Sequence, residues 1–466
     1  MKPKISLNNK RIIIIGAGPT GLGAARRLGE LHYSNWVVYE RNSYSGGLSA
    51  SFKDKIGFWW DIGGHILFSH YKYYDNLMDF LLKDKWIFHN RNAMIWIRNH
   101  FVPYPFQYNL RHLSAKIMDE CVFGIEKLYK KNKRQKSIEN FYDWILSTFG
   151  NGVAKYFMIP YNTKVWAGPL DNVGYYWISD RIALPDLERI KNNIIQKRDD
   201  ISWGPNNRFR FPVNGGTGAI WRELAKRIPK DKIFYNKEVF RIDTKKRKIF
   251  FADGAFDEYD ILISTIPIDS LIEITHIDDF KYLPTQLFYS SVITIGIGLK
   301  GSPPDLLKDK CWIYFPENKY PFYRMTVFSN YSPRNVPDIN KYWSLMVEVA
   351  ESKRKPVKDN EKLIQNTIRI IKNAHFIKSE KEITSLYTNR VEYGYPTPTL
   401  RREQNLKPVY AFLENINIYT RGRFGLWKYE VGNMDHSLMQ GVECIDRIFF
   451  NKKELTAWHP EVVNRR

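Results

Sequence analysis

The order of apolar and polar residues near the N-terminus predicts a strand, a helix and a second strand. Residues 12–15 are four consecutive isoleucines, which suit a strand that is buried on both faces. Residues 20–31 are expected to form the connecting helix, and residues 36–39 form another short apolar run. This order predicts a βαβ unit at the start of a parallel sheet.

The pattern changes twice farther along the chain. Between residues 107 and 197 apolar spacing of three to four positions predicts a helical subdomain. Residues 286–350 contain several alternating segments, which predict an antiparallel sheet. Residues 359–374 predict an amphipathic helix, and the last helix is expected at about 437–450, after His436. Shorter segments predict a helix at 73–82, a hairpin of 93–97 with 101–102, a helix opened by 215–218, and strands at 239–242, 248–251 and 260–264.

The turn between the first strand and helix has the chemistry of a dinucleotide site. Gly16, Gly18 and Gly21 form a G-x-G-x-x-G pattern, in which they allow the tight turn, the approach of a pyrophosphate and close helix packing. Glu40 follows directly after the second strand, at the distance expected for a ribose-binding acid. An ordinary glycine-rich turn is the alternative, but strand, turn, helix, strand and acid occur together in order.

The continuation with Arg41, Gly46 and Gly47 resembles the FAD-binding variant of this fold more than the NAD-binding variant, so FAD is the expected dinucleotide. The predicted fold class is therefore α/β: an FAD-binding Rossmann-type domain with an inserted helical subdomain and an antiparallel β-sheet substrate domain. The predicted boundaries are 1–85, 204–285 and 390–466 for the discontinuous FAD domain, 107–200 for the helical subdomain, and 86–106 with 286–389 for the sheet domain.

The net charge of the chain bears on which anionic ligand it binds. The 466-residue chain has a net charge of +22, but its lysines and arginines are spread along the sequence. The one dense block, 127–136, follows an amphipathic helical stretch and is interpreted as a solvated helix end. Without a nucleic-acid-binding motif, we expect the basic charge to attract an anionic sugar nucleotide or dinucleotide instead of nucleic acid.

The cysteines and the apolar segments suggest the cellular setting. Cys121, Cys311 and Cys444 are few, odd in number and far apart, so neither a disulfide framework nor a metal site is expected. A reducing, cytoplasmic location follows as an expectation. Because no segment reaches about 18 uninterrupted apolar residues, no transmembrane helix is predicted.

Downstream segments are unusually dense in aromatic residues, glycine and arginine. They contain no carboxylate pair and no Ser-His-Asp or Cys-His arrangement, so they suit binding of an anionic, sugar-bearing ligand while a cofactor carries the chemistry. The segments are residues 63–70, 102–107, 160–166, 203–212, 311–316, 321–324, 328–331, 395–399 and 421–433.

These segments, in this order, resemble the UDP-galactopyranose mutase family in its eukaryotic-type branch, from Gly16 to about Asn464. The resemblance implies a flavin-dependent isomerase that interconverts UDP-galactopyranose and UDP-galactofuranose. It implies reduced FAD as the active cofactor, a covalent adduct between flavin N5 and the sugar, and no net redox change.

The resemblance also assigns residues. Arg181 and Arg324 match the arginines that hold the pyrophosphate in this family. His65 is assigned to flavin contact in preference to proton transfer. These three are the predicted catalytic residues. The implied cofactor-binding residues are Gly16, Gly18, Gly21, Glu40, Arg41, Gly46, Gly47, Gly63, Gly64, Arg423 and Asn433. The implied substrate-binding residues are Tyr104, Phe106, Gln107, Asn162, Trp166, Asn206, Trp312, Tyr314, Tyr331, Tyr395 and Tyr429.

Some positions depart from the family pattern. Arg91 matches a position linked to NADPH, the possible reductant, but Ala93 stands where eukaryotic-type members tend to carry serine. Met434 and Thr163 also differ from the family residues.

Three alternatives remain open: the same reaction on another UDP-sugar, an FAD amine oxidase or desaturase, and a catalytically silent flavoprotein. The paired arginines argue against the last two, since neither needs a pyrophosphate clamp. The oligomeric state is left open.

Overall fold

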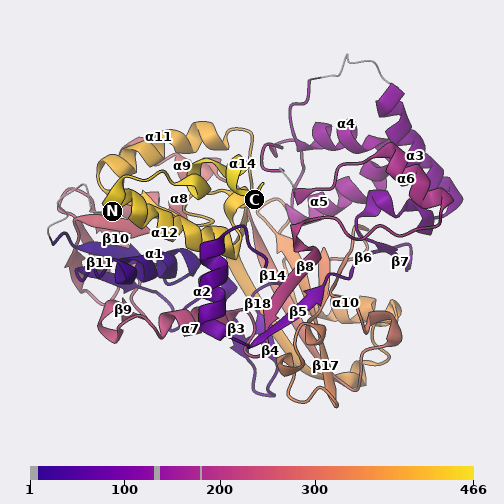
Figure 1. The fold of residues 1–466 in the computed structure, drawn as a ribbon, viewed down its shortest axis with the longest axis horizontal. Helices are drawn as coiled ribbons and strands as arrows, with labels where there is room; N and C mark the ends of the chain where they lie inside the picture. Colours follow the sequence, from indigo (N-terminus) through magenta and orange to yellow (C-terminus); the bar gives the residue numbers. More distant parts are fainter. Residues whose placement is uncertain (1–8, 131–136, 179–180, 466) are drawn as a thin grey trace.

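A computed structural model describes residues 9–130, 137–178 and 181–465. The segments near the two ends of the chain lie together at the left of Figure 1, around one sheet. The helical region occupies the upper right, and a larger sheet lies below it. Part of the basic block 127–136 and the residues just before Arg181 fall outside the described residues.

The apolar runs at 12–15 and 36–39 form neighbouring strands of a five-stranded parallel sheet, as predicted. Alternate isoleucines of its central strand enter different cores: Ile12 and Ile14 pack on one face, and Ile13 and Ile15 on the other. A four-isoleucine run is thus explained by burial on both faces. The strand order is β19 (Ile418–Thr420), β13 (Ile261–Ser264), β1 (Ile12–Ile15), β2 (Trp36–Tyr39) and β9 (Ile233–Phe234).

Two helices pack tightly beside this sheet. They are α1 (Pro19–Glu30) and the C-terminal α12 (Met434–Phe450). Their backbones approach so closely that a Cβ added at Gly23 would lie 2.4 Å from the carbonyl oxygen of Leu438. The helix predicted at about 437–450 begins at Met434, so the prediction that it starts after His436 was wrong, and two short helices follow it. Asp435 lies in the first turn, where a carboxylate is favourable to the helix dipole.

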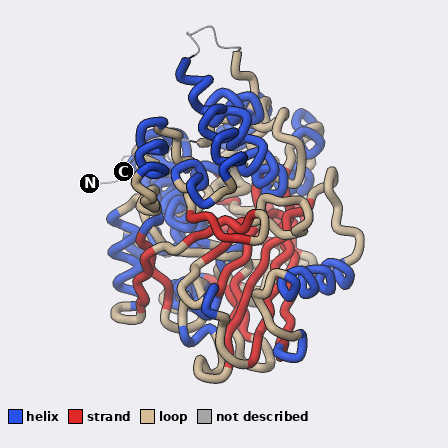
Figure 2. The backbone as a smooth tube through the Cα atoms, turned by 90° about the vertical axis from the view of Figure 1, so that its right-hand side faces the viewer, coloured by secondary structure: helices blue, strands red, loops and turns tan. Residues whose placement is uncertain are grey.

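A seven-stranded sheet forms the second large layer. Its long strand β14 (Tyr289–Lys300) carries the predicted alternation, and the helix α10 (Asn360–Asn373) packs into the same core. Figure 2 shows these strands side by side below the helices. Among the described strand pairs of this sheet, only β15 and β6 run parallel. The order is β18 (Ile383–Pro396), β14, β17 (Tyr342–Glu351), β16 (Arg324–Val327), β15 (Trp312–Tyr314), β6 (Ala93–Ile97) and β7 (His100–Pro103).

The region predicted to be helical is helical. Its helices share one core with the segment around Phe106 and Tyr108. The helices are α3 (Ala115–Lys130), α4 (Phe141–Val153), α5 (Ile159–Val165) and α6 (Leu187–Ile195), with a π-turn at Ala154–Met158.

Some elements were not predicted. β18 alternates half-buried and exposed residues and lies at a sheet edge, so its apolar signal is weak, and the expected domain boundary at 389/390 falls inside it. The helix α11 (Arg402–Asn415) contains Pro408. In the described sheets, β5 (Trp86–Asn90) pairs only with β8 (Arg208–Pro212), and the first residues of these two strands are 122 positions apart in the chain.

The remaining elements of the fold are β3 (Ser51–Lys53), β4 (Trp59–Asp61), α2 (Lys72–Leu82), α7 (Gly218–Ala225), β10 (Val239–Asp243), β11 (Lys248–Phe251), β12 (Phe256–Glu258), α8 (Ile268–Thr275), α9 (Leu283–Gln286), α13 (Leu455–Trp458) and α14 (Pro460–Val463).

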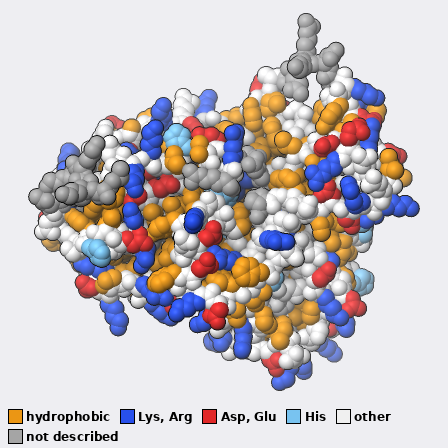
Figure 3. Space-filling view, viewed as in Figure 1, with side chains coloured by type: hydrophobic (Ala, Val, Ile, Leu, Met, Phe, Trp, Pro, Cys, Tyr) orange, Lys and Arg blue, Asp and Glu red, His pale blue; other side chains and the backbone are white. Residues whose placement is uncertain are grey.

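The described surface matches the spread of charge in the sequence. On the face shown in Figure 3, lysine and arginine side chains are scattered among acidic and apolar ones. Among the described residues, no helix is both long and apolar enough to cross a membrane.

Candidate active site

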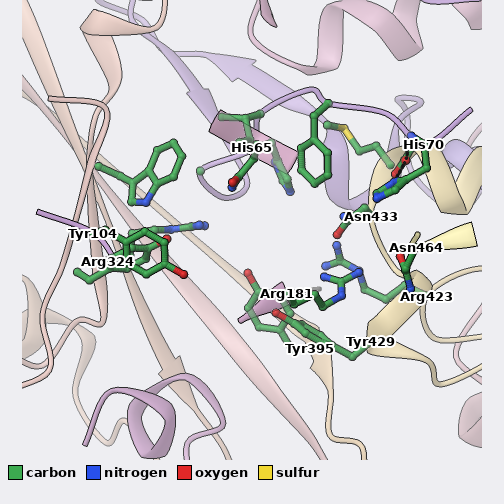
Figure 4. A pocket seen from close by; sticks show the side chains of 18 of the residues that line it. His65, His70, Tyr104, Arg181, Arg324, Tyr395, Arg423, Tyr429, Asn433 and Asn464 are labelled. Atoms are coloured by element: carbon green, nitrogen blue, oxygen red, sulfur yellow. Dashed lines mark hydrogen bonds and ion pairs between the residues drawn. The ribbon is translucent and has the colours of Figure 1, made fainter. Parts of the chain in front are cut away.

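One pocket brings together residues from all three predicted parts of the chain. The loop at 63–70 forms one wall, the seven-stranded sheet a second, and the start of α12 a third. Side chains from these walls point toward a common space (Figure 4). The predicted site residues that line it are Gly64, His65, Tyr104, Arg181, Asn206, Trp312, Tyr314, Arg324, Tyr395, Arg423, Tyr429 and Asn433.

The nucleotide fingerprint has the geometry of a phosphate-binding turn. Gly16 has φ +102°, which favours glycine, and a Cβ at Gly21 would lie 1.9 Å from the carbonyl oxygen of Gly16. No side chain caps the N-terminus of α1 in the described part of the chain, so its N–H groups face outward for a phosphate. Gly46 and Gly47 also have positive φ, and the Cα of Gly47 faces Gly18.

Glu40 follows directly after β2, beside this turn, and is buried. Its Oε2 accepts the N–H of Ala17 at 2.7 Å, and its Oε1 accepts the N–H and the side-chain amide of Asn42 at 2.9 and 2.7 Å. A carboxylate offers about four acceptor positions, so capacity remains for a ribose hydroxyl. Arg41 next to it is exposed.

The start of α12 and Arg423 lie at one end of the pocket, with the Asp435 carboxylate in the first turn of the helix. Asn433 and Met434 line the pocket, and no described side chain caps this helix. Beside them, Arg423 is held by the carbonyls of Gly432 and Gly394 at 2.8 and 3.2 Å, and burial lowers its pKa. An uncapped helix N-terminus and a buried guanidinium favour an electron-rich ligand, such as reduced isoalloxazine.

His65 has no hydrogen-bond partner for its Nδ1 among the described residues, although that atom is buried. Burial, followed by the charge of Arg423, lowers the His65 pKa to about 4. The ring is therefore neutral near pH 7, which does not suit a base with a pKa near the working pH. An unpartnered buried nitrogen in a residue that lines this pocket fits a bound polar ring system, and the residues here fit FAD.

The two predicted phosphate arginines are held differently. Arg181 lies over the ring of Tyr429, with 5.2 Å from Cζ to the ring centroid, and donates from Nη2 to the carbonyl of Glu430 at 2.6 Å. Its buried Nε has no partner in the described part of the chain. Arg324 instead pairs with the buried Glu348, with 2.8 Å between Nη2 and Oε1 and a second contact from Nε to Oε2.

The tyrosine and asparagine side chains complete the polar lining. Burial raises the pKa values of Tyr104, Tyr314 and Tyr395, so their hydroxyls stay protonated and can donate to phosphate or sugar oxygens. Asn206 accepts from Nη1 of Arg91 at 2.6 Å through Oδ1, which leaves its amide nitrogen for the pocket.

Other predicted substrate residues lie behind the pocket wall. Tyr331 is packed against Phe209, Phe211 and Phe328 and does not line the pocket. Phe106, Gln107, Asn162 and Trp166 are likewise buried outside the lining; Gln107 donates to the carbonyl of Ala183 at 2.5 Å, and Asn162 to that of Met158 at 2.7 Å.

The pocket also contains residues that were not predicted as site residues, among them His70, which was expected to be structural. Asn464, near the end of the chain, donates to the carbonyl of Glu430 at 3.2 Å, the same oxygen that holds Arg181. His70 also lines the pocket and bonds Asp435 at 2.8 Å. A single asparagine or histidine has no local sequence signal; only the fold brings these residues to the site.

A family model described as flavin containing amine oxidoreductase matches residues 19–402. A crystal structure of reduced UDP-galactopyranose mutase superposes with a TM-score of 0.94 and 45% identity, over 98% of this chain and 99% of that one. The chain belongs to the UDP-galactopyranose mutase family. A mutase is an isomerase, so this is a family of isomerases within the flavin-containing group.

More distant structures share the fold alone. A fatty acid isomerase from P. acnes has a TM-score of 0.65 at 15% identity, covering 96% of this chain and 100% of that one. Cyclohexylamine oxidase from Brevibacterium oxydans IH-35A has a TM-score of 0.63 at 13% identity, covering 95% and 99%. The predicted α/β flavoprotein fold is confirmed.

Curated relatives match only short stretches. The 15-cis-phytoene desaturase of Synechococcus elongatus (strain ATCC 33912 / PCC 7942 / FACHB-805) is 41% identical over 61 residues, which is 13% of this chain and 13% of that protein. The enzyme of Glycine max is 39% identical over 66 residues, or 14% and 11%. The chain thus spans about an eighth of the length of these relatives.

Proposed function

We propose that this protein interconverts UDP-galactopyranose and UDP-galactofuranose with reduced FAD as cofactor. The observation that carries the proposal is the convergence of Arg181 and Arg324 on the pocket that also holds His65 and the start of α12. One end of this pocket suits a diphosphate and the other suits a flavin, so a nucleotide sugar placed between them has its anomeric carbon toward the flavin.

The arginines and tyrosines hold the diphosphate. Arginine forks match paired phosphate oxygens, and hydroxyls of Tyr395 and Tyr429 can add hydrogen bonds. A leaving diphosphate must stay in position to recapture the sugar, which is an orientation task. Each charged hydrogen bond contributes about 1.5–3 kcal/mol net, so losing one arginine weakens binding roughly 10- to 100-fold.

When bound, reduced FAD supplies the nucleophile through its N5 in a sugar exchange without net oxidation. The protein's own contribution is positional. Neutral His65 packs beside that end of the pocket without adding a charge, and the buried walls restrict water. Asn206 presents its amide nitrogen toward the sugar position, fixed by Arg91.

The decisive experiment is incubation of dithionite-reduced protein with UDP-galactofuranose, followed by separation of the products. We expect UDP-galactopyranose to form, and no turnover with the oxidised protein. UDP-arabinopyranose and N-acetylated UDP-sugars, tested in parallel, measure which sugar is preferred. If no UDP-sugar is isomerised under reducing conditions, the proposal is wrong.

The matching family model makes an amine oxidase the second candidate. The charge of the pocket argues against it, because Arg181, Arg324 and Arg423 would repel a protonated amine. Oxygen consumption driven by an amine distinguishes the two: we expect none. We propose NADPH as the reductant. The assay adds NADPH to the oxidised protein without oxygen and follows the visible absorbance of the flavin; we expect a loss of absorbance similar to that given by dithionite.

A further inference from the structure

Glu348 lies in β17 directly beneath the pocket, with its side chain 1% exposed. Its carboxylate binds Arg324 through both oxygens. The same carboxylate accepts the backbone N–H of Gly64 at 3.3 Å and the hydroxyl of Tyr323 at 3.3 Å. One buried anion therefore joins the phosphate-facing arginine to the loop on the flavin side.

The loop rests on this ion pair with no side chain between them. A Cβ added at Gly63 would lie 3.1 Å from Oε1 of Glu348. A Cβ at Gly64 would lie 3.3 Å from Nη2 of Arg324 and 2.8 Å from Oγ1 of Thr326. Packing this close means that a displacement of the carboxylate or guanidinium is transmitted to the loop backbone.

The charges of the pair also reach His65, the next residue of the loop. The Glu348 carboxylate acts to raise the His65 pKa, and the Arg324 guanidinium acts to lower it. A diphosphate that draws Arg324 toward the pocket changes this balance, because the guanidinium then shares its hydrogen bonds between two anions.

We propose that Glu348 is a positioning residue that couples diphosphate binding at Arg324 to the flavin-facing loop at Gly64. This rests on the proposed function, since it requires a diphosphate at one end of the pocket and a flavin at the other. The coupling is reciprocal: if UDP binds the oxidised and reduced protein with different affinities, it shifts the flavin midpoint potential in proportion to the logarithm of the affinity ratio.

A buried carboxylate–arginine pair also has a simpler function, the positioning of β16 against β17. Such pairs often contribute little net stability, and the loss of one partner destabilises the fold. Stability alone does not separate the two roles. The linkage between UDP and flavin does, because a structural pair has no reason to affect it.

The test compares Glu348→Gln with the wild-type holoprotein. Dissociation constants for UDP are measured by calorimetry on the oxidised and the dithionite-reduced forms. The flavin midpoint potential is measured with and without saturating UDP. For wild type we expect at least a tenfold ratio of the two constants, which corresponds to about 30 mV for a two-electron couple. For Glu348→Gln we expect a ratio below about threefold.

Glu351→Gln is the matched control. Glu351 lies in the same strand, is 6% exposed and pairs with Arg390 away from the pocket. Its removal is expected to leave the wild-type ratio unchanged. Glu348→Asp keeps the charge but shortens the reach of the carboxylate to Gly64, so it should also reduce the ratio of the two UDP dissociation constants. It replaces Glu348→Gln as the test variant if the glutamine variant fails to fold.

Each outcome decides the inference. A wild-type ratio near one, or an unchanged ratio in Glu348→Gln or in Glu348→Asp, overturns the coupling while leaving the mutase proposal intact. An equal loss in Glu351→Gln also overturns it, since the effect is then a general loss of a buried pair. Failure of wild type to bind UDP at all contradicts the proposed function itself.

Discussion

At the scale of single residues, similar side chains have different environments. Arg181 is held by a carbonyl and an aromatic ring and keeps its full charge available, whereas Arg324 shares its charge with Glu348. Arg181 is therefore the better test of diphosphate binding, because its replacement leaves no buried carboxylate unpaired.

Replacing Arg181 with alanine should weaken UDP binding about 10- to 100-fold, because one charged hydrogen-bonding group is lost. Calorimetry on the oxidised holoprotein measures this without turnover. Arg369→Ala is the control: Arg369 lies on α10 and donates to Asn366 at 2.7 Å, away from the pocket. An affinity for UDP equal to that of wild type would remove Arg181 from the phosphate site.

Asp61 gives a pH dependence of stability. It is buried, and it accepts hydrogen bonds from Ser51 and Thr217, yet burial raises its pKa to about 7. The folded state thus binds a proton more tightly than the unfolded state, whose pKa is about 3.9. This contribution is full below about pH 4 and is lost as pH rises through 7, by at most about 1.4 kcal/mol per pH unit.

We expect Asp61→Asn to flatten the decline in stability between pH 5 and pH 8, measured as the urea midpoint. Asp54→Asn is the contrasting variant, because hydrogen bonds, from Ser385 first, lower the Asp54 pKa against the opposing effect of burial. Its contribution is present above the unfolded pKa and is lost as pH falls. Parallel slopes for wild type and Asp61→Asn would show that Asp61 does not titrate in this range.

At the scale of elements, the contact between α1 and α12 joins the nucleotide-binding turn to the pocket. α1 presents its N-terminus to the predicted phosphate site, and α12 presents its own to the flavin-facing end. Their backbones touch at Gly23, so the spacing between these ends depends on a position without a side chain.

A pair of glycines in α1 tests this contact. Gly23→Ala places a methyl 2.4 Å from the Leu438 carbonyl oxygen and should destabilise the protein by about 1–3 kcal/mol. Gly29→Ala is in the same helix with open space around it, so it should stabilise by about 0.5–1 kcal/mol. Denaturant unfolding and FAD content measure both. A neutral Gly23→Ala would show that the helices can separate without cost.

At the scale of the whole molecule, the site depends on how the parts meet. Lys164 in α5 links the helical region to the large sheet: its buried Nζ donates to the carbonyls of Phe315 at 2.6 Å and Glu317 at 3.2 Å. Lys164 is separated by one residue from both Asn162 and Trp166, two predicted substrate residues.

Lys164→Met should therefore destabilise the protein by about 1–3 kcal/mol, because buried carbonyls lose their partner. Thermal unfolding and UDP affinity are the measurements. Lys155→Met removes a surface pair with Glu120 in the same region and should cost at most about 1 kcal/mol. If both variants unfold at the same temperature, the link through Lys164 is unimportant.

Local patterns predicted much of the fold. The strand at 36–39 and the hairpin around residues 98–99 match the structure because their signals are short-range: an apolar run, and a turn between two strands. β18 escaped prediction because an edge strand with one exposed face carries polar residues at alternate positions. The start of α12 differs because two nearby residues suit a helix N-terminus: Asn433 occupies the N-cap position, and Asp435 lies in the first turn.

Residue identities and spacing within short segments were enough to predict the family, the nucleotide-binding turn and most of the side chains in the pocket. The three-dimensional fold was needed to see that Glu348 pairs with Arg324, that Asn464 shares a carbonyl with Arg181, and that Tyr331 packs away from the pocket. Such contacts join residues far apart in the chain, and they depend on burial and direction, which no local pattern encodes.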